Sequence, residues 1–140
     1  KPDIAYFGQK DFQQTVVIKR IVSDLNLDVN IKILPTIRDN EGLALSSRNA
    51  YLNETERKDA LCLYSSLVKA QSMVNAGIKK AEEILLEMEK VINNCKTARI
   101  DYISIVNPET LAAVPRVRNG DVVALAVRIG KTRLIDNVIL

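Results

Sequence analysis

Histidine and tryptophan are both absent from this sequence of 140 residues. Without an imidazole, the chain contains no histidine general acid or base and lacks the commonest ligand of transition metals, so we expect no metal site in it. Any catalysis must therefore rest on Lys, Arg, Asp, Ser, Gln and backbone amides. Aromatic residues are also few, four Tyr and two Phe, which argues against a surface that stacks nucleic-acid bases.

A strong excess of one charge and long apolar runs are missing as well. The 20 Lys and Arg residues exceed the 17 Asp and Glu residues by a net charge of +3, which is too small to indicate nucleic-acid binding. No apolar run approaches the roughly 20 residues that cross a bilayer, and no signal peptide opens the sequence. We therefore expect neither nucleic acid nor a membrane as a partner.

Cysteine is limited to Cys62 and Cys95, which lack the CxxC spacing of zinc and redox motifs. We expect both to be reduced, buried thiols of a cytoplasmic protein rather than a disulfide pair. The rest of the composition, with 47% hydrophobic and 26% charged residues, is that of an ordinary globular protein.

The first third of the chain carries the pattern of a strand, a helix and a second strand. Residues 4–7 form an apolar run that Gly8 ends, and residues 29–34 form a second run rich in β-branched residues. Between them, apolar residues at helical spacing predict a helix from Phe12 to about Leu25. A strand-helix-strand unit of this length should have parallel strands and a right-handed crossover.

A capping signal marks the start of this helix. Asp11 is the predicted N-cap, and Gln14 follows three residues later, as in a capping box. Because the two strands are predicted to be parallel, the loops 8–11 and 36–48 that follow them should leave the sheet at the same edge. In open α/β sheets that edge binds ligands.

After Asn49 the pattern changes to two amphipathic helices. Asn53 or Thr55 is the predicted N-cap of the first helix, and Gly77 ends it. The core face of this first helix is expected to hold Leu61, Tyr64, Leu67 or Val68, and Met73. The second helix has one apolar face, formed by Ile78, Ala81, Ile84, Leu85, Met88, Val91 and Ile92.

Three strands follow, at residues 100–106, 122–129 and 132–135, and a two-residue turn, Gly130-Lys131, joins the last two. Residues 50–140 are thus predicted to form a small α+β domain of two helices on an antiparallel three-stranded sheet. Asp101 and Asp136 lie on these strands, and we expect both to face solvent or to protect a sheet edge.

The first loop, residues 8–11, has two interpretations. Gly8 allows a ligand close to the backbone, Lys10 can place a charge on a phosphate, and the following helix adds the partial positive charge of its N-terminus. Alternatively the segment is a plain turn, in which Gly8 makes the bend, Lys10 lies in solvent, and Asp11 and Gln14 cap the helix.

The second loop ends in Ser46, Ser47 and Arg48, whose hydroxyls and guanidinium can hold a triphosphate and neutralise charge as pyrophosphate leaves. Alternatively Ser47 caps a helical turn, and Arg48 pairs with Glu41 or Asp39 at the surface. Two cationic, amide-rich loops at one ligand-binding edge favour a phosphate site over either alternative.

Three segments, KPDIAYFGQKDFQQ, LPTIRDNEGLALSSRN and TRLIDN, together resemble the pantothenate synthetase (pantoate–β-alanine ligase) family. The similarity is nearly continuous over residues 1–55, looser through 56–120, and returns at 121–137. Gln9 is a departure, because the family usually has Glu there. That position neighbours the key residues rather than being one of them, so the resemblance is little affected.

The resemblance implies a Mg²⁺-dependent ligase whose substrates are ATP, pantoate and β-alanine. The pantoate carboxylate attacks the α-phosphate of ATP to give pantoyl-adenylate and pyrophosphate, and the β-alanine amine then displaces AMP. Catalytic roles fall to Lys10, Ser46, Ser47 and Arg48, and pantoate binding falls to Gln14. The implied ATP-binding residues are Gly8, Gln9, Lys10, Asp11, Ile37, Leu45, Ser46, Ser47 and Arg48.

The resemblance also implies a domain organisation. Residues 1–49 would be the last βαβ piece of a Rossmann-like nucleotidyltransferase domain that binds ATP and pantoate, and residues 50–140 would be a lid-like C-terminal domain. The family's HIGH-type motif lies upstream, and a chain without histidine does not contain it. We therefore expect the isolated chain to be inactive and the full-length protein to be a cytoplasmic homodimer.

Two alternatives come from other classes of function. One is a related adenylate-forming nucleotidyltransferase that acts on another acid. The other is a C-terminal dimerisation or binding module in which residues 50–140 are the functional part.

Overall fold

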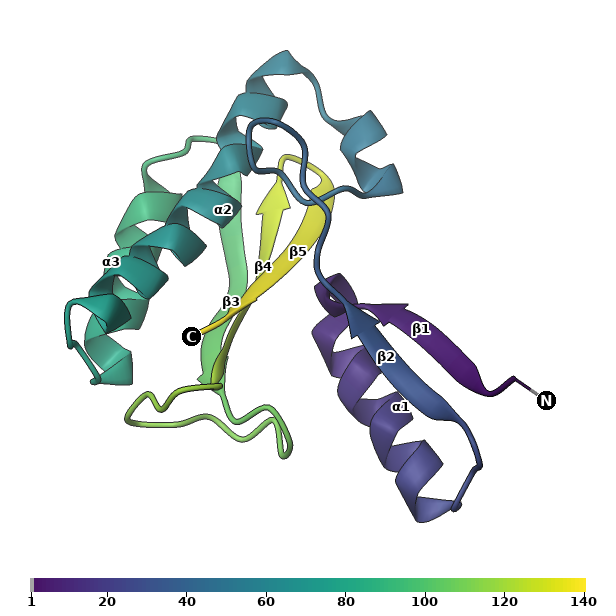
Figure 1. Cartoon of the computed structure of the whole chain (residues 1–140). Helices are drawn as coiled ribbons and strands as arrows, with labels where there is room; N and C mark the ends of the chain where they lie inside the picture. Colours follow the sequence, from purple (N-terminus) through teal and green to yellow (C-terminus); the bar gives the residue numbers. More distant parts are fainter. Residues whose placement is uncertain (1) are drawn as a thin grey trace.

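The computed structural model describes residues 2–140. Figure 1 shows two parts, one formed by β1, α1 and β2 and the other by α2, α3 and the sheet β3-β4-β5, with the segment after β2 leading from the first to the second. Both parts contribute to the site described below, because the first part lies against the β5 side of the second.

The first part is the expected strand-helix-strand unit. β1 (Ile4–Gly8) pairs in parallel with β2 (Asn30–Leu34), so the predicted parallel pairing is confirmed. A short 3-10 helix, η1 (Gln9–Asp11), follows β1 and leads directly into α1 (Phe12–Asp24). The predicted start of the helix is therefore correct, and its end lies one residue before the expected one.

The predicted capping box at the start of α1 is wrong. Asp11 occupies the N-cap position, but its side chain makes no capping hydrogen bond. Its backbone, at φ −93° and ψ 59°, lies outside the extended conformation that normally aims an N-cap side chain at the first helical amides. The chain has already turned through η1, so Asp11 enters α1 from a helical turn rather than from an extended strand.

One apolar face of this first part lies open. Val17 and Ile21 of α1, and Leu25 at its C-terminal cap, are 51%, 46% and 66% exposed, although their helical spacing is that of a core face. Together with neighbouring residues from β1 and β2, Ile21 lines a shallow apolar groove. Contiguous exposed apolar surface is typical of an interaction site.

The second part consists of two helices on a sheet. α2 (Glu54–Asn75) and α3 (Ala81–Asn93) pack against β3 (Ala98–Val106), β4 (Val122–Ile129) and β5 (Thr132–Ile139), which are antiparallel in that order. The predicted two helices on an antiparallel three-stranded sheet are confirmed. β5 continues four residues beyond its predicted end, along the whole length of β4.

The N-cap of α2 is Asn53, one of the two residues predicted for it. Its side chain accepts a hydrogen bond from the Glu56 amide at 2.9 Å, and the Glu56 carboxylate accepts one from the Asn53 amide at 3.0 Å. This reciprocal pair is a complete capping box. Gly77, at φ +90°, follows the end of the helix, as predicted.

The core face of α2 is rotated from the predicted one. Leu67 and Met73 are buried as expected, but Val68 is 43% exposed, and Leu61 and Tyr64 are only partly buried. The most deeply buried positions on α2 are Ala60, Leu63, Ser66, Leu67 and Ala70. Three of these are small residues, which let α3 and the sheet approach closely, and an expectation built on large apolar residues overlooked them.

The two cysteines are free thiols in this second part. Cys62 is buried, and Cys95 is partly buried. Burial raises the pKa of the Cys62 thiol far above its usual value, and a neighbouring Cys95 adds to the rise, so this thiol stays protonated. Within residues 2–140, no helix is both long and apolar enough to span a bilayer.

Candidate functional site at the edge of the parallel strands

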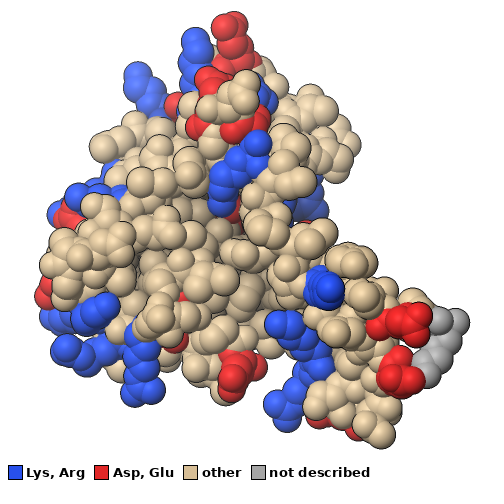
Figure 2. Space-filling model, viewed as in Figure 1, with Lys and Arg blue, Asp and Glu red and all other residues tan. Residues whose placement is uncertain are grey.

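Two loops leave the same edge of the β1-β2 pair. Gly8 and Leu34 are the last residues of their strands and are paired with each other, so η1 and the segment that begins at Pro35 emerge side by side, as predicted. Figure 2 shows that the surface is hollowed on this face, between the part that holds η2 and the part that holds β1. The candidate site lies along this edge.

Residues 37–45 fold into a tight hairpin that shapes the second loop. The Leu45 amide donates to the Ile37 carbonyl at 2.9 Å, and the Asp39 amide donates to the Leu43 carbonyl at 2.9 Å. At the tip, one Asp39 carboxylate oxygen accepts from the amides of Glu41 and Leu43, both at 3.0 Å. This is the local preference of aspartate for turns.

The Asp39 carboxylate is stabilised in its charged form by the contacts of this hairpin. Burial acts to raise its pKa, but the backbone amides of Leu43 and Glu41 and the guanidinium of Arg57 outweigh burial and hold the pKa below its usual value. Arg57 contacts the second carboxylate oxygen at 2.5 Å. The hairpin is thereby tied to the first turns of α2.

A buried ion pair joins the hairpin to the last strand. The Arg38 guanidinium donates to both carboxylate oxygens of Asp136, at 2.5 and 2.9 Å. The Asp136 side chain is 2% exposed and that of Arg38 is 18% exposed, so the pair is largely withdrawn from water. Arg38 also donates to the Gly42 carbonyl at 3.1 Å and lies 4.3 Å from the centre of the Tyr64 ring.

The expectation that Asp136 faces solvent or protects a sheet edge is wrong. Asp136 lies on the inner side of the edge strand, where Arg38 from the hairpin pairs with it. The same expectation for Asp101 agrees better with the structure. The Asp101 carboxylate lies near the surface, where it pairs with Arg128 at 3.2 Å and with Arg133 at 2.7 Å. The bond from Arg133 is the main reason that the pKa of Asp101 is lowered.

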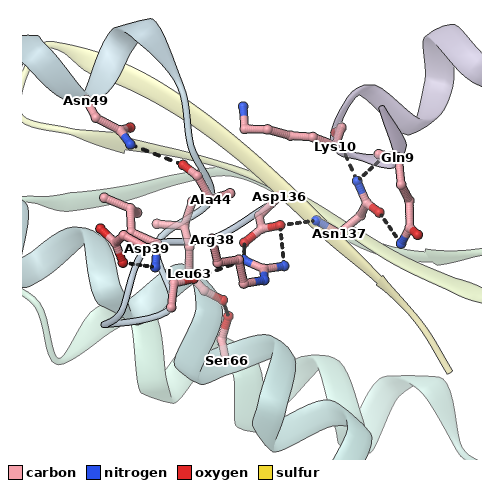
Figure 3. A network of polar contacts seen from close by, with 12 residues as sticks. Gln9, Lys10, Arg38, Asp39, Ala44, Asn49, Leu63, Ser66, Asp136 and Asn137 are labelled. Atoms are coloured by element: carbon pink, nitrogen blue, oxygen red, sulfur yellow. Dashed lines mark hydrogen bonds and ion pairs between the residues drawn. The ribbon is translucent and has the colours of Figure 1, made fainter. Parts of the chain in front are cut away.

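Asn137, next to Asp136, joins the last strand to the first loop. Its side-chain amide donates to the carbonyls of Gln9 and Lys10, both at 2.9 Å, and its carbonyl oxygen accepts from Gln9 Nε2 at 3.2 Å. Figure 3 shows these contacts beside the Arg38–Asp136 pair, with the Lys10 side chain extending away from them. Asn137 on β5 thus makes three hydrogen bonds to η1.

Lys10 and Ser46, one from each predicted loop, border the same narrow crevice, whose volume of about 10 Å³ is no more than the space for one water molecule. Asp136 and Asn49 also border it, and Asn49 donates to the Ala44 carbonyl at 3.1 Å. Within residues 2–140, the Lys10 ammonium has neither a hydrogen bond nor an ion pair. A cation without a partner at the N-terminal end of α1 is suited to bind an anion.

Gln14 lies in a neighbouring cavity of about 210 Å³ that Lys10, Asp11 and Asn137 also border. The remaining predicted residues do not line these two cavities. Ile37 is 71% and Leu45 is 53% exposed, and the others that lie outside are Gly8, Gln9, Ser47 and Arg48.

The alternative interpretation of the second loop is wrong in its details. Ser46, not Ser47, caps the short helix η2 (Ser47–Tyr51), because its hydroxyl accepts from the Arg48 amide at 3.2 Å. Arg48 donates to the Arg133 carbonyl at 3.2 Å rather than pairing with Asp39 or Glu41. The Ser47 side chain and the Arg48 guanidinium therefore lie on the exposed side of the loop.

Gly42 is the point where the hairpin passes closest to α2. Its φ of +98° suits glycine, and a Cβ added there would overlap ring carbons of Tyr64. We expect Gly42→Ala to lower the free energy of unfolding by about 2–4 kcal/mol, from left-handed strain and overlap together. Urea denaturation of the 140-residue chain measures this loss.

Gly77→Ala is the matched control for that substitution. Gly77 has a similar φ of +90°, but a Cβ there would meet nothing within 4 Å. It should therefore show the backbone strain alone, about 1–2 kcal/mol. Equal losses for the two variants would contradict the close contact between Gly42 and Tyr64.

Comparison with known proteins identifies relatives along the entire chain. The family model for pantoate-beta-alanine ligase matches residues 1–139. The pantothenate synthetase of Dehalococcoides mccartyi strain CBDB1 is 51% identical over 140 residues, which are all of this chain and 52% of that protein. That of Thermosipho africanus is 49% identical over 140 residues, 50% of its length. The chain spans about half the length of the curated relatives it matches.

Solved structures give the same picture. The crystal structure of pantothenate synthetase from Thermus thermophilus matches 97% of this chain and 49% of its own, with a TM-score of 0.92 and 40% identity. A pantoate-beta-alanine ligase from Francisella tularensis, complexed with beta-gamma ATP and beta-alanine, matches 98% of this chain and 43% of its own. Its TM-score is 0.66, at 30% identity.

Proposed function

Because this chain belongs to the pantoate-beta-alanine ligase family, we propose that the full-length protein condenses pantoate with β-alanine at the expense of ATP. The observation that carries the proposal is that Lys10 and Ser46, from the two loops with phosphate-binding chemistry, border one narrow crevice. The Francisella tularensis relative, solved in complex with beta-gamma ATP and beta-alanine, supports the choice of ligands.

The proposed reaction has two steps. A pantoate carboxylate oxygen bonds to the α-phosphorus of ATP, and the bond from that phosphorus to pyrophosphate breaks. The β-alanine nitrogen then bonds to the acyl carbon of pantoyl-adenylate, AMP leaves, and the nitrogen loses a proton. Lys10 offsets negative charge that grows on the phosphates in the first step, and the Ser46 hydroxyl donates a hydrogen bond to them.

The remaining residues take supporting roles in this proposal. Gln14 holds pantoate in the cavity next to Lys10. The crevice between Lys10 and Ser46 is too narrow to enclose a phosphate, so in this proposal the phosphates lie over its mouth. Ser47 and Arg48 contact them from the exposed side of the loop. The further contacts to ATP come from Gly8, Gln9, Asp11, Ile37 and Leu45.

Mg²⁺ has no ready-made protein site in the described part of the chain. Residues 2–140 contain no group of three or more His, Cys, Asp or Glu side chains arranged to hold a metal ion. Asp136, which borders the crevice between Lys10 and Ser46, is already bound by Arg38. We therefore propose that Mg²⁺ enters with the phosphates of ATP, as is usual for nucleotide substrates, and we assign no step to it.

The open apolar face of α1 supports a domain assignment for the full-length protein. We propose that residues 1–49 complete a Rossmann-like nucleotidyltransferase domain, whose other half covers this face, and that residues 50–140 form the C-terminal domain. The free thiols of Cys62 and Cys95 are compatible with a cytoplasmic location. Homodimer formation stays a prediction from the resemblance.

The test is pantoate-dependent exchange of labelled pyrophosphate into ATP. We expect the full-length protein to catalyse it, and the isolated 140-residue chain to give neither exchange nor pantothenate, because it spans only about half the length of its relatives. A full-length protein that responds to another acid but not to pantoate would favour a related nucleotidyltransferase. Pantothenate formation by the isolated chain would refute the proposed division of the site.

A further inference from the structure

Asn137 uses its whole side chain to bridge the two parts of the molecule. It is 2% exposed. Its nitrogen donates to two successive carbonyls, those of Gln9 and Lys10, and its oxygen accepts from the Gln9 side chain. A primary amide has two N–H donors, so the nitrogen is fully used by this pair of bonds. The contact is therefore specific to asparagine rather than to any polar residue.

The position of the Lys10 ammonium depends on this contact. The lysine side chain has no hydrogen bond or ion pair of its own within residues 2–140, so the backbone of η1 decides where it starts. That backbone is a single short helical turn between β1 and α1, and its residues Gln9–Asp11 are not buried. The two bonds from Asn137 fix the carbonyls at Gln9 and Lys10 themselves.

Asn137 is itself bound through its backbone amide. Its own amide donates to Asp136 Oδ1 at 2.8 Å, and the same carboxylate binds Arg38, which donates to Gly42 in the second loop. One continuous set of contacts therefore runs from the first loop through β5 to the second loop (Figure 3). It connects the loop that carries Lys10 to the loop that carries Ser46.

We propose that Asn137 is a positioning residue that fixes η1 on β5 and so places Lys10 opposite Ser46. This inference rests on the proposed function of Lys10 in ATP binding. It assigns the last strand, which carries no ATP contact in the proposal above, a direct part in building the ATP site. Reaction geometry is sensitive to displacements of this kind, since a shift of about 1 Å costs about 100-fold in rate.

Asn137→Asp in the full-length protein is the main test. The substitution keeps the size of the side chain but replaces the amide donor with a carboxylate, which repels the carbonyls of Gln9 and Lys10. We expect kcat/KM for ATP to fall about 10- to 100-fold, with KM for ATP raised and KM for β-alanine unchanged. Asn119→Asp, at an exposed asparagine, makes the same change of charge and should leave all constants unaltered.

Hydrogen exchange provides a readout that does not depend on activity. In Asn137→Asp, amides in the peptide that covers residues 6–14 should exchange faster, whereas those of β4 should keep the exchange rates of the unsubstituted protein. Gln9→Ala is the milder second variant for hydrogen exchange, because it removes the bond to the Asn137 oxygen and leaves the two bonds from the Asn137 nitrogen to backbone carbonyls. It should speed exchange at residues 6–14 by a smaller factor, and it serves if Asn137→Asp does not fold. Its ATP kinetics are not a test, because Gln9 is itself a proposed ATP contact.

The combination with Lys10→Met separates this inference from the proposed function. If Asn137 acts through Lys10, adding Asn137→Asp to Lys10→Met should lower kcat/KM for ATP much less than it does alone. Lys10→Met without effect on ATP would defeat the proposed function, while the exchange result would still decide whether Asn137 holds η1. The positioning role would be overturned if the two substitutions lowered kcat/KM for ATP by fully additive free energies. It would also be overturned if hydrogen exchange at residues 6–14 were unchanged in Asn137→Asp.

Discussion

Replacing Lys10 with methionine in the full-length protein is expected to lower kcat for adenylate formation by about 10²–10³-fold, the usual cost of losing one preorganised donor to a developing negative charge. Methionine keeps most of the apolar stem and removes only the ammonium. Because that ammonium has no partner within residues 2–140, its loss should break no internal contact. Single-turnover measurement of pyrophosphate release gives the rate directly.

Lys19→Met is the matched control for this result. Lys19 lies on α1, which follows η1, is exposed, and borders neither of the two spaces that Lys10 lines. It should leave kcat and KM unchanged. If KM for ATP rises in Lys10→Met while kcat stays constant, Lys10 binds ATP equally in the ground and transition states. Unaltered kcat and KM together would contradict any phosphate role.

Much of the fold could be predicted from local patterns. The parallel β1-β2 pair, the start of α1, the Asn53 cap and the three antiparallel strands each have a signal within a few residues of sequence. Both loops of the candidate site could be found for the same reason, since parallel strands joined by a helix send their following loops to one edge. Lys10 and Ser46 do border one crevice.

The contacts that connect the two loops could not be found in this way. Arg38, Asp136 and Asn137 come from segments far apart in the sequence, and each pattern alone is that of an ordinary charged or polar residue. The Arg38–Asp136 pair and the bonds from Asn137 to η1 depend on how the second part of the molecule packs against the first. For Arg38, the decisive neighbours are Gly42 and the Tyr64 ring, which only the folded hairpin brings to it.

One signal for Asp136 was nevertheless present. Side chains in a strand alternate between faces, so Asp136 shares a face with Leu134, two residues earlier. Leu134 is buried in the core, and Asp136 is buried on the same side. A buried aspartate requires a cationic or hydrogen-bonding partner, and this alternation, weighed against the general expectation for charged strand residues, would have indicated one.

This reasoning leads to a large expected effect on stability. Asp136→Ala should lower the free energy of unfolding by about 3 kcal/mol, because it leaves the mostly buried Arg38 guanidinium without its carboxylate. The low end of the usual range applies, since Arg38 keeps the Gly42 carbonyl and the Tyr64 ring. The Asn137 amide also loses its acceptor. Native-state hydrogen exchange of β4 and β5 amides measures the loss in the full-length protein.

Two further variants show whether loss of the buried Arg38–Asp136 pair causes the lower stability of Asp136→Ala. Asp136→Asn keeps an oxygen for Arg38 and for the Asn137 amide, so it should be destabilised less than Asp136→Ala. Asp101→Asn removes a carboxylate that binds two arginines near the surface, where water replaces it, and it should change exchange in β4 and β5 little. Suppose that the β4 and β5 amides exchanged as slowly in Asp136→Ala as in Asp101→Asn. The Arg38–Asp136 pair would then not stabilise the contact between the second loop and β5. The fixed separation of Lys10 and Ser46 would then need another physical origin.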